Sequence, residues 1–171
     1  SGASPMVTGS ALCLQGIARS YLGAPLTPEA LRTLINETGI ASLGAEPVFV
    51  GVTEALVIDL DDLAAKAGEA RVLLLSHMRG HIADMDRLMA ICDKAGVAVI
   101  EDCAHTMGAA WRGVPSGRHG VIGCYSCQTY KHVNSGEGGF VVTDDAELAA
   151  KMVLMSGSYM LFERHGAAPD S

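Results

Sequence analysis

Apolar runs of strand length alternate with helical patterns along the middle of the chain. Strand-like runs lie at 47–52, 71–77, 97–100, 121–126 and 140–143, and helical patterns lie at 59–67, at 84–95 and from Asp144 or Asp145 onward. Apolar strands separated by amphipathic helices are typical of a parallel sheet with helices on both faces. We therefore predict an α/β fold, with a mainly parallel sheet in a three-layer α/β/α arrangement. Residues 1–45 show the weakest pattern.

Composition narrows the class of protein. The chain has 171 residues, of which 49% are apolar and 18% charged, as expected for one soluble globular domain. No apolar run approaches the roughly 20 residues that span a bilayer, and no membrane association is expected. The five cysteines, an odd number, favour reduced thiols and a cytoplasmic location. A net charge of -7 without a basic cluster argues against a nucleic-acid partner.

Chemically competent side chains follow the predicted strands. Ser76 and His77 follow the first clear strand; Glu101, Asp102, Cys103 and His105 follow the next; Ser126, Cys127, Gln128 and Lys131 follow the third. Parallel α/β sheets bind ligands at the carboxyl ends of their strands. These side chains are therefore predicted to lie along one edge of the sheet and to include a functional site.

Three motifs in this region occur in a specific order. The chain reads Val-Ile-Glu-Asp-Cys-Ala-His at 99–105, has a Ser at 126 with a Lys five residues later, and continues with Gly-Glu-Gly-Gly at 136–139. Together they resemble the DegT/DnrJ/EryC1/StrS family of sugar aminotransferases, which are fold type I pyridoxal-phosphate enzymes. The resemblance extends to 44–50 and to the Ala-Asp-Met-Asp text within 80–86, and spans about 40–165. It implies a pyridoxal 5'-phosphate cofactor.

The resemblance implies a catalytic role for two residues, and their chemistry agrees with it. A carboxylate beside the pyridine nitrogen keeps that nitrogen protonated, so that the ring can accept electrons; Asp102 occupies this position. Lys131 corresponds to the Schiff-base lysine, whose amine also moves a proton in a partly desolvated site. Some members of the family carry His in place of this Lys and act as dehydratases. The retained Lys131 favours transamination.

Further cofactor-binding residues follow from the same resemblance. Ser126 matches a phosphate-binding hydroxyl, and His105 stands where the family has Gln or His near the cofactor ring. Gly9 and Ser10 resemble a small-residue turn at a helix start, which binds phosphate through its N–H groups. Asn134 corresponds to a residue that reaches the neighbouring subunit's cofactor phosphate. The resemblance therefore implies a homodimer with shared active sites.

The implied reaction transfers an amino group from glutamate or glutamine to a keto sugar, expected to be nucleotide-linked. Members of the family are about twice as long as this chain. We therefore expect residues 1–171 to be a partial pyridoxal-phosphate-binding large domain, with the carboxyl-terminal small domain absent. The competing hypothesis is a non-catalytic binding or assembly module derived from such an enzyme.

A zinc site is an alternative interpretation of the cysteines and a histidine in this region. Cys124 and Cys127, with Cys103 and His105, have ligand types and a two-residue gap that suit zinc. However, the two cysteines lie on a predicted strand and its exit, and the resemblance gives the intervening Ser126 another role. We expect no metal. The Gly-rich turn lacks the spacing of a dinucleotide-binding loop, so a nicotinamide enzyme is disfavoured.

Overall fold

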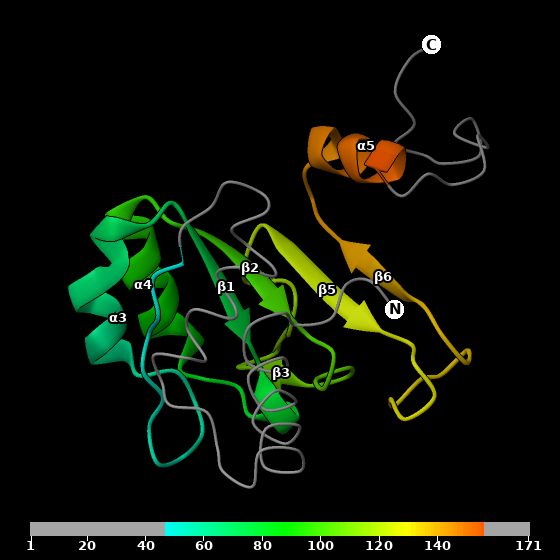
Figure 1. Ribbon diagram of the computed structural model, residues 1–171, viewed down its shortest axis with the longest axis horizontal. Helices are drawn as coiled ribbons and strands as arrows, with labels where there is room; N and C mark the ends of the chain where they lie inside the picture. The colour runs from blue at the N-terminus through cyan, green and yellow to red at the C-terminus, as the bar shows by residue number, and fades with distance from the viewer. Residues whose placement is uncertain (1–46, 156–171) are drawn as a thin grey trace, which may run out of the picture.

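The computed structural model of the protein describes residues 47–155. A four-stranded sheet has the order β1-β2-β5-β6 (Figure 1). Its strands are β1 (Val72–Ser76), β2 (Ala98–Asp102), β5 (Ile122–Ser126) and β6 (Gly139–Val142). β1, β2 and β5 are parallel, and β6 pairs with β5 in the antiparallel direction. The predicted fold class, an α/β protein with a mainly parallel sheet, is confirmed.

Aspartate side chains cap the starts of the helices, and a glycine ends α4. The helices are α3 (Leu60–Lys66), α4 (Met85–Ala95) and α5 (Ala146–Met155), with the short 3-10 helices η2 (Ala67–Glu69) and η3 (Met78–Gly80). The carboxylates of Asp59, Asp84 and Asp145 each accept hydrogen bonds from N–H groups of the first turn that follows. Gly96, with a φ of 70°, ends α4 in the left-handed conformation. The predicted helices are therefore confirmed, and no described helix is long and apolar enough to cross a membrane.

The hydrophobic core lies between one face of the sheet and the helices α3 and α4, which pack side by side (Figure 1). Leu75 of β1 and Val99 of β2 meet Leu63 of α3 and Leu88 of α4, and all four are at most 2% exposed. Side chains alternate between the faces of a strand. Accordingly Leu74, beside Leu75, lies on the other face and is 45% exposed. The two faces of the sheet therefore have different surroundings.

A close backbone contact joins β5 to the loop that precedes it. A Cβ atom added to Gly123 would lie 2.4 Å from the carbonyl oxygen of Gly117, which is closer than real Cβ contacts. A two-stranded hairpin, β3 (Ala110–Trp111) with β4 (Val114–Pro115), comes just before this loop. The absence of a side chain at Gly123 allows the loop to lie directly on the sheet.

The predicted strand at 47–52 was wrong. The structure assigns no strand to 47–51, and among the described residues Val52 forms an isolated bridge to Ile58. The segment's main chain instead bonds to α3: the Gly51 N–H donates to Asp62 Oδ2 at 2.6 Å, and Lys66 Nζ donates to the Phe49 carbonyl oxygen at 2.9 Å. Because polar side chains of a helix satisfy these backbone groups, the β-branched run does not need a neighbouring strand.

Candidate functional site

The carboxyl ends of three strands bring polar side chains together on one face. Ser76 of β1 pairs with Asp102 of β2, and Asp102 pairs with Cys124 of β5. Residues paired in register share a face of the sheet, and Ser126 lies on that face because it is two residues beyond Cys124. The parallel register thus places hydroxyl, carboxylate and thiol groups along one sheet edge, as the sequence predicted.

Within residues 47–155, two hydrogen bonds hold the Asp102 carboxylate in place. The Ser76 hydroxyl donates to Asp102 Oδ2 at 3.1 Å, and the Ala104 N–H donates to Oδ1 at 3.1 Å. The residue is 7% exposed. A carboxylate offers about four acceptor positions, so two further donors can still bind. Asp102 is therefore a fixed, buried acceptor with capacity for a ligand.

His105 links the other predicted residues. Its Nδ1 accepts a hydrogen bond of 3.1 Å from the main-chain N–H of Arg79. Burial lowers the pKa of His105 below its ordinary value, the positive charge of Lys131 lowers it further, and the carboxylate of Asp102 opposes both. Since Lys131 and Asp102 both act on this imidazole, residues after β2 and β5 share one electrostatic environment.

The loop between β5 and β6 positions Lys131. Two main-chain hydrogen bonds close the loop, from the Cys127 N–H to the Gly138 carbonyl and from the Thr129 N–H to the Gly136 carbonyl, both at 2.9 Å. Inside it, the Lys131 N–H donates to the Gln128 carbonyl oxygen at 2.9 Å. Lys131 is half-buried. The loop therefore holds the Lys131 main chain between β5 and β6, and the charge of Lys131 acts on His105.

The structure locates most of the predicted site residues. Lys131 and Asp102 both act electrostatically on His105, and Ser126 lies on the same sheet face as Asp102, where its Oγ accepts a hydrogen bond of 3.3 Å from the Gln128 N–H. Asn134 is exposed on the same loop as Lys131. The predicted phosphate-binding residues Gly9 and Ser10 lie outside the described residues.

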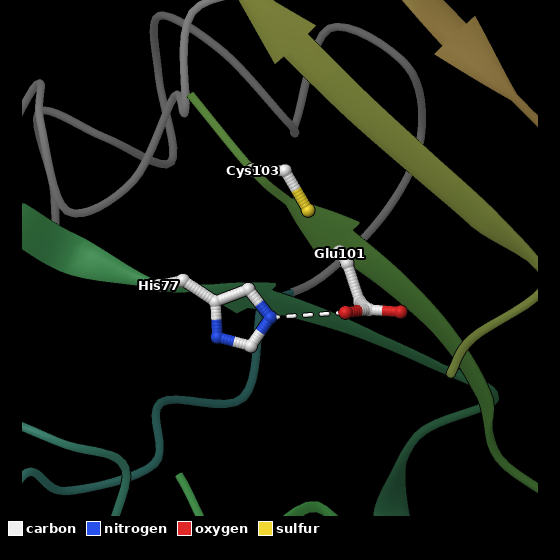
Figure 2. Close-up of side chains that lie close together, drawn as sticks. All are labelled: His77, Glu101 and Cys103. Carbon is white, nitrogen blue, oxygen red and sulfur yellow. Dashed lines mark hydrogen bonds and ion pairs between the residues drawn. The ribbon is translucent and has the colours of Figure 1, made fainter. Parts of the chain in front are cut away.

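Glu101 was predicted to lie with Asp102 among the functional side chains at the sheet edge, but the structure buries it on the other face of the sheet. It is 0% exposed and lies on the sheet face opposite Asp102, where its carboxylate is hydrogen-bonded to His77 Nε2 at 3.0 Å (Figure 2). The N–H groups of Gly117, His119 and Gly120 donate to it at 2.7 to 2.8 Å. Adjacent residues of a strand face opposite sides of the sheet, so alternation along β2 could have shown that Glu101 and Asp102 lie on different faces.

The pKa of Glu101 reflects these contacts. Burial alone would raise it, but the hydrogen bonds from His77 and from three main-chain N–H groups outweigh burial and lower the pKa to about 2. The carboxylate is therefore ionised at neutral pH, and His77 Nε2 donates to it. Glu101 fixes the loop at 117–120 and the end of β1 onto β2.

Cys103 lies beside this pair, and the ligand atoms of His77, Glu101 and Cys103 are within 4.8 Å of one another (Figure 2). Within 47–155 this is the cluster with metal-ligand geometry, rather than the combination of Cys124, Cys127, Cys103 and His105. However, four N–H donors already fill the Glu101 carboxylate. Burial raises the pKa of the Cys103 thiol to about 11, which keeps it protonated. The hydrogen bonds of this cluster therefore join Glu101 to His77 and to the loop at 117–120, which is a structural role.

The fold and the residues at the sheet edge define an α/β protein with polar side chains at the carboxyl ends of its parallel strands, which is where such folds bind ligands. Comparison with protein families gives a specific assignment. The model of the DegT/DnrJ/EryC1/StrS aminotransferase family matches residues 36–169. The chain belongs to this family, as its motifs indicated.

Individual relatives agree with the family assignment. The chain is 35% identical over 152 residues to L-glutamine:scyllo-inosose aminotransferase of Streptomyces griseus. This aligned region covers 86% of this chain and 36% of that protein. The sugar aminotransferase CalS13 of Micromonospora echinospora is 35% identical, with a TM-score of 0.63 over 87% of this chain and 42% of that one. An aminotransferase of Psychrobacter cryohalolentis is 36% identical, with a TM-score of 0.63 over 70% and 31%. The chain spans about a third of the length of such curated relatives.

Proposed function

We propose that residues 1–171 are part of the large domain of a pyridoxal-phosphate-dependent aminotransferase. In this proposal the enzyme moves an amino group from glutamine or glutamate to a ketone on a polyhydroxylated ring. The observation that carries the proposal is the shared environment of Asp102, His105 and Lys131 at one sheet edge. Family membership supports the same chemistry.

The residues at the edge fit pyridoxal 5'-phosphate. When bound, this cofactor supplies an electron sink for the carbanion formed at the substrate carbon. The buried Asp102 carboxylate has remaining acceptor capacity and would hold a proton on the ring nitrogen. The carboxylate, imidazole, hydroxyl and amine of Asp102, His105, Ser126 and Lys131 therefore match the chemical groups of the cofactor.

Lys131 would perform the covalent and proton-transfer work. Its Nζ would be the group that holds the cofactor covalently, and as a free amine it would move a proton to and from the substrate carbon. The Gln128 carbonyl and the closed loop hold the Lys131 main chain in position for this. His105 would contact the ring, and the Ser126 hydroxyl would bind the phosphate.

Three further residues and the assembly belong to the proposal. Gly9 and Ser10 would add N–H donors to the phosphate. Asn134 is exposed on the Lys131 loop and would reach the cofactor phosphate of a second copy, in a homodimer with shared sites. The expected cellular location is the cytoplasm.

The substrate class rests on the relatives. Their names specify L-glutamine as the amino donor and scyllo-inosose or its deoxy forms, which are keto cyclitols, as acceptors. Another similar protein is described as a sugar aminotransferase. We therefore propose L-glutamine as the donor and a keto cyclitol or keto sugar as the acceptor. A narrower version of the proposal is that the acceptor is a keto sugar linked to a nucleotide.

Cofactor attachment tests the proposal directly. The purified protein with added pyridoxal phosphate should absorb in the visible range, and borohydride should fix the label on the peptide containing Lys131. Lys131→Ala should abolish the fixed label. Lys94→Ala removes an exposed lysine of α4 and should retain it. Unchanged labelling of Lys131→Ala would refute the assignment.

Reaction with the donor separates the enzyme from the non-catalytic module. L-Glutamine added to the loaded protein should convert the bound cofactor to its amine form, with one equivalent of the keto acid released. A protein that binds the cofactor at Lys131 and never makes this conversion would support the module instead.

A further inference from the structure

The turn after β1 has an unusual backbone. Arg79, in η3, has a φ of 55° and a ψ of 24°, and Gly80 follows with a φ of 85°. A non-glycine residue in this left-handed region is uncommon, and such residues are kept where surrounding contacts determine them. The turn is closed by hydrogen bonds of 3.1 Å from the Gly80 N–H to the His77 carbonyl and from the His81 N–H to the Met78 carbonyl.

The left-handed pair places main chain directly against His105. The Arg79 N–H donates to His105 Nδ1 at 3.1 Å. A Cβ atom added to Gly80 would lie 3.3 Å from the His105 carbonyl oxygen, which shows how closely the turn and the segment after β2 approach each other. The contact joins the ends of β1 and β2 on the edge that carries Asp102.

This contact determines the proton position on the imidazole. A neutral imidazole has one N–H and one acceptor nitrogen. Because Nδ1 accepts from a main-chain N–H, the proton is on Nε2. We propose that the Arg79 N–H fixes His105 as the Nε2–H tautomer, so that this side chain presents a hydrogen-bond donor, and not a proton-transfer group, to the cofactor.

The surrounding charges favour the same neutral form. Burial lowers the pKa of His105, and the positive charges of Lys131 and Arg79 lower it further, against the opposing carboxylate of Asp102. Protonation of Nδ1 would also set an N–H against the Arg79 N–H. Near neutral pH, His105 is therefore a neutral imidazole that donates a hydrogen bond from Nε2 and positions the cofactor.

The tautomer can be measured without the cofactor. The inference about the cofactor rests on the proposed function, but long-range proton–nitrogen NMR of the purified protein, labelled with ¹⁵N at its six histidines, reports the imidazole alone. The resonance lost in His105→Gln identifies the residue. We expect the Nε2–H pattern at pH 7 and a pKa below 6.5. An Nδ1–H pattern, or an imidazolium at pH 7, would overturn the proposal.

Arg79→Ala is the matched control for the main-chain origin of the effect. It removes the guanidinium and retains the N–H, so the tautomer should persist while the pKa of His105 rises. Loss of the Nε2–H pattern in this variant, with the circular dichroism spectrum unchanged, would show that the side chain and not the main chain fixes the tautomer.

A pair of variants tests the donor role. His105→Gln offers a carbonyl oxygen to the Arg79 N–H and an outward amide donor, whereas His105→Met has similar length and neither group. The dissociation constant for pyridoxal phosphate should stay within about threefold in the first and rise about tenfold or more in the second. Equal losses, or no loss in either, would overturn the donor role. A wild-type protein that shows the tautomer and binds no cofactor would refute the proposed function alone.

Discussion

Glu101 and Asp102 are neighbours in β2, but their carboxylates lie on opposite faces of the sheet and serve different surroundings. Glu101 accepts four hydrogen bonds from His77 and the loop at 117–120. Asp102 accepts two from the described part of the chain and keeps acceptor capacity at the sheet edge. One residue therefore joins parts of the fold, and the next is available for chemistry.

Glu101 predicts a specific loss of stability in acid. Its pKa falls from 4.5 in the unfolded chain to about 2 in the folded protein, so its stabilisation is complete above about pH 5 and is lost as the pH falls toward 2. The contribution is of the order of 3 kcal/mol at neutral pH. Urea unfolding between pH 7 and pH 2.5 measures it.

Glu101→Gln should remove most of this acid dependence and destabilise the protein by about 3 kcal/mol at pH 7. The variant has an NH2 donor in place of one carboxylate oxygen, and this donor would face the N–H groups that now bond to Glu101. Asp61→Asn is the control, since Asp61 pairs with Arg87 on the surface. It should change stability by less than about 1 kcal/mol. An acid dependence retained in full by Glu101→Gln would show that other carboxylates cause it.

Asp102→Asn is predicted to separate catalysis from folding. The amide matches the carboxylate in shape but carries no charge to hold a proton on the cofactor's ring nitrogen. The single-turnover rate with L-glutamine should fall by about 100-fold or more, with the melting temperature changed by a few degrees. Ser76→Ala removes one hydrogen bond to Asp102 and should reduce the rate less. A rate in Asp102→Asn within about twofold of wild type would contradict the assigned role.

Gly123→Ala tests the close approach of β5 and the preceding loop. The added methyl would meet the Gly117 carbonyl oxygen at 2.4 Å, and main-chain atoms on both sides would have to move. We expect a loss of about 2–3 kcal/mol in the free energy of unfolding. Gly68→Ala, where nothing lies within 4 Å, should change it little. Equal stabilities for the two variants would show that the loop moves away freely.

Leu88→Ala and Leu74→Ala compare the two faces of the sheet. Leu88 is fully buried between α4 and the sheet, so its truncation should cost about 3 kcal/mol. Leu74 is 45% exposed and should cost about 1 kcal/mol or less in the isolated chain. Denaturant unfolding of both variants measures the difference. A larger loss at Leu74 would show that its face is covered in solution.

Local signals in the sequence predicted most of the described fold. Helices α3 and α4 were visible from their apolar spacing and begin after capping residues Asp59 and Asp84. The position of Asp102 and His105 after a predicted parallel strand indicated that they lie at the ligand-binding edge of the sheet. The family resemblance added the role of Lys131. The prediction of a strand at 47–52 was wrong because the main chain of this run bonds to side chains of a helix, those of Asp62 and Lys66.

The role of Glu101 depends on contacts distant in sequence. Its partners include His77, which is 24 residues earlier, and Gly120, which is 19 residues later. No local periodicity reports that a loop will return to a particular carboxylate. The Arg79 contact with His105 also joins residues 26 apart, and depends on a left-handed backbone that the residue type does not indicate.

The order Glu-Asp in β2 also protects the pairing of the sheet. A shift of this strand by one residue would exchange the faces of all its side chains. The shorter Asp102 would then be directed toward the N–H groups that converge on Glu101, and Glu101 toward the ligand edge. Such a misaligned chain would leave buried donors unsatisfied and Val99 turned away from the core. Two adjacent acidic residues of different length thus penalise the wrong alignment during folding, before any ligand is present.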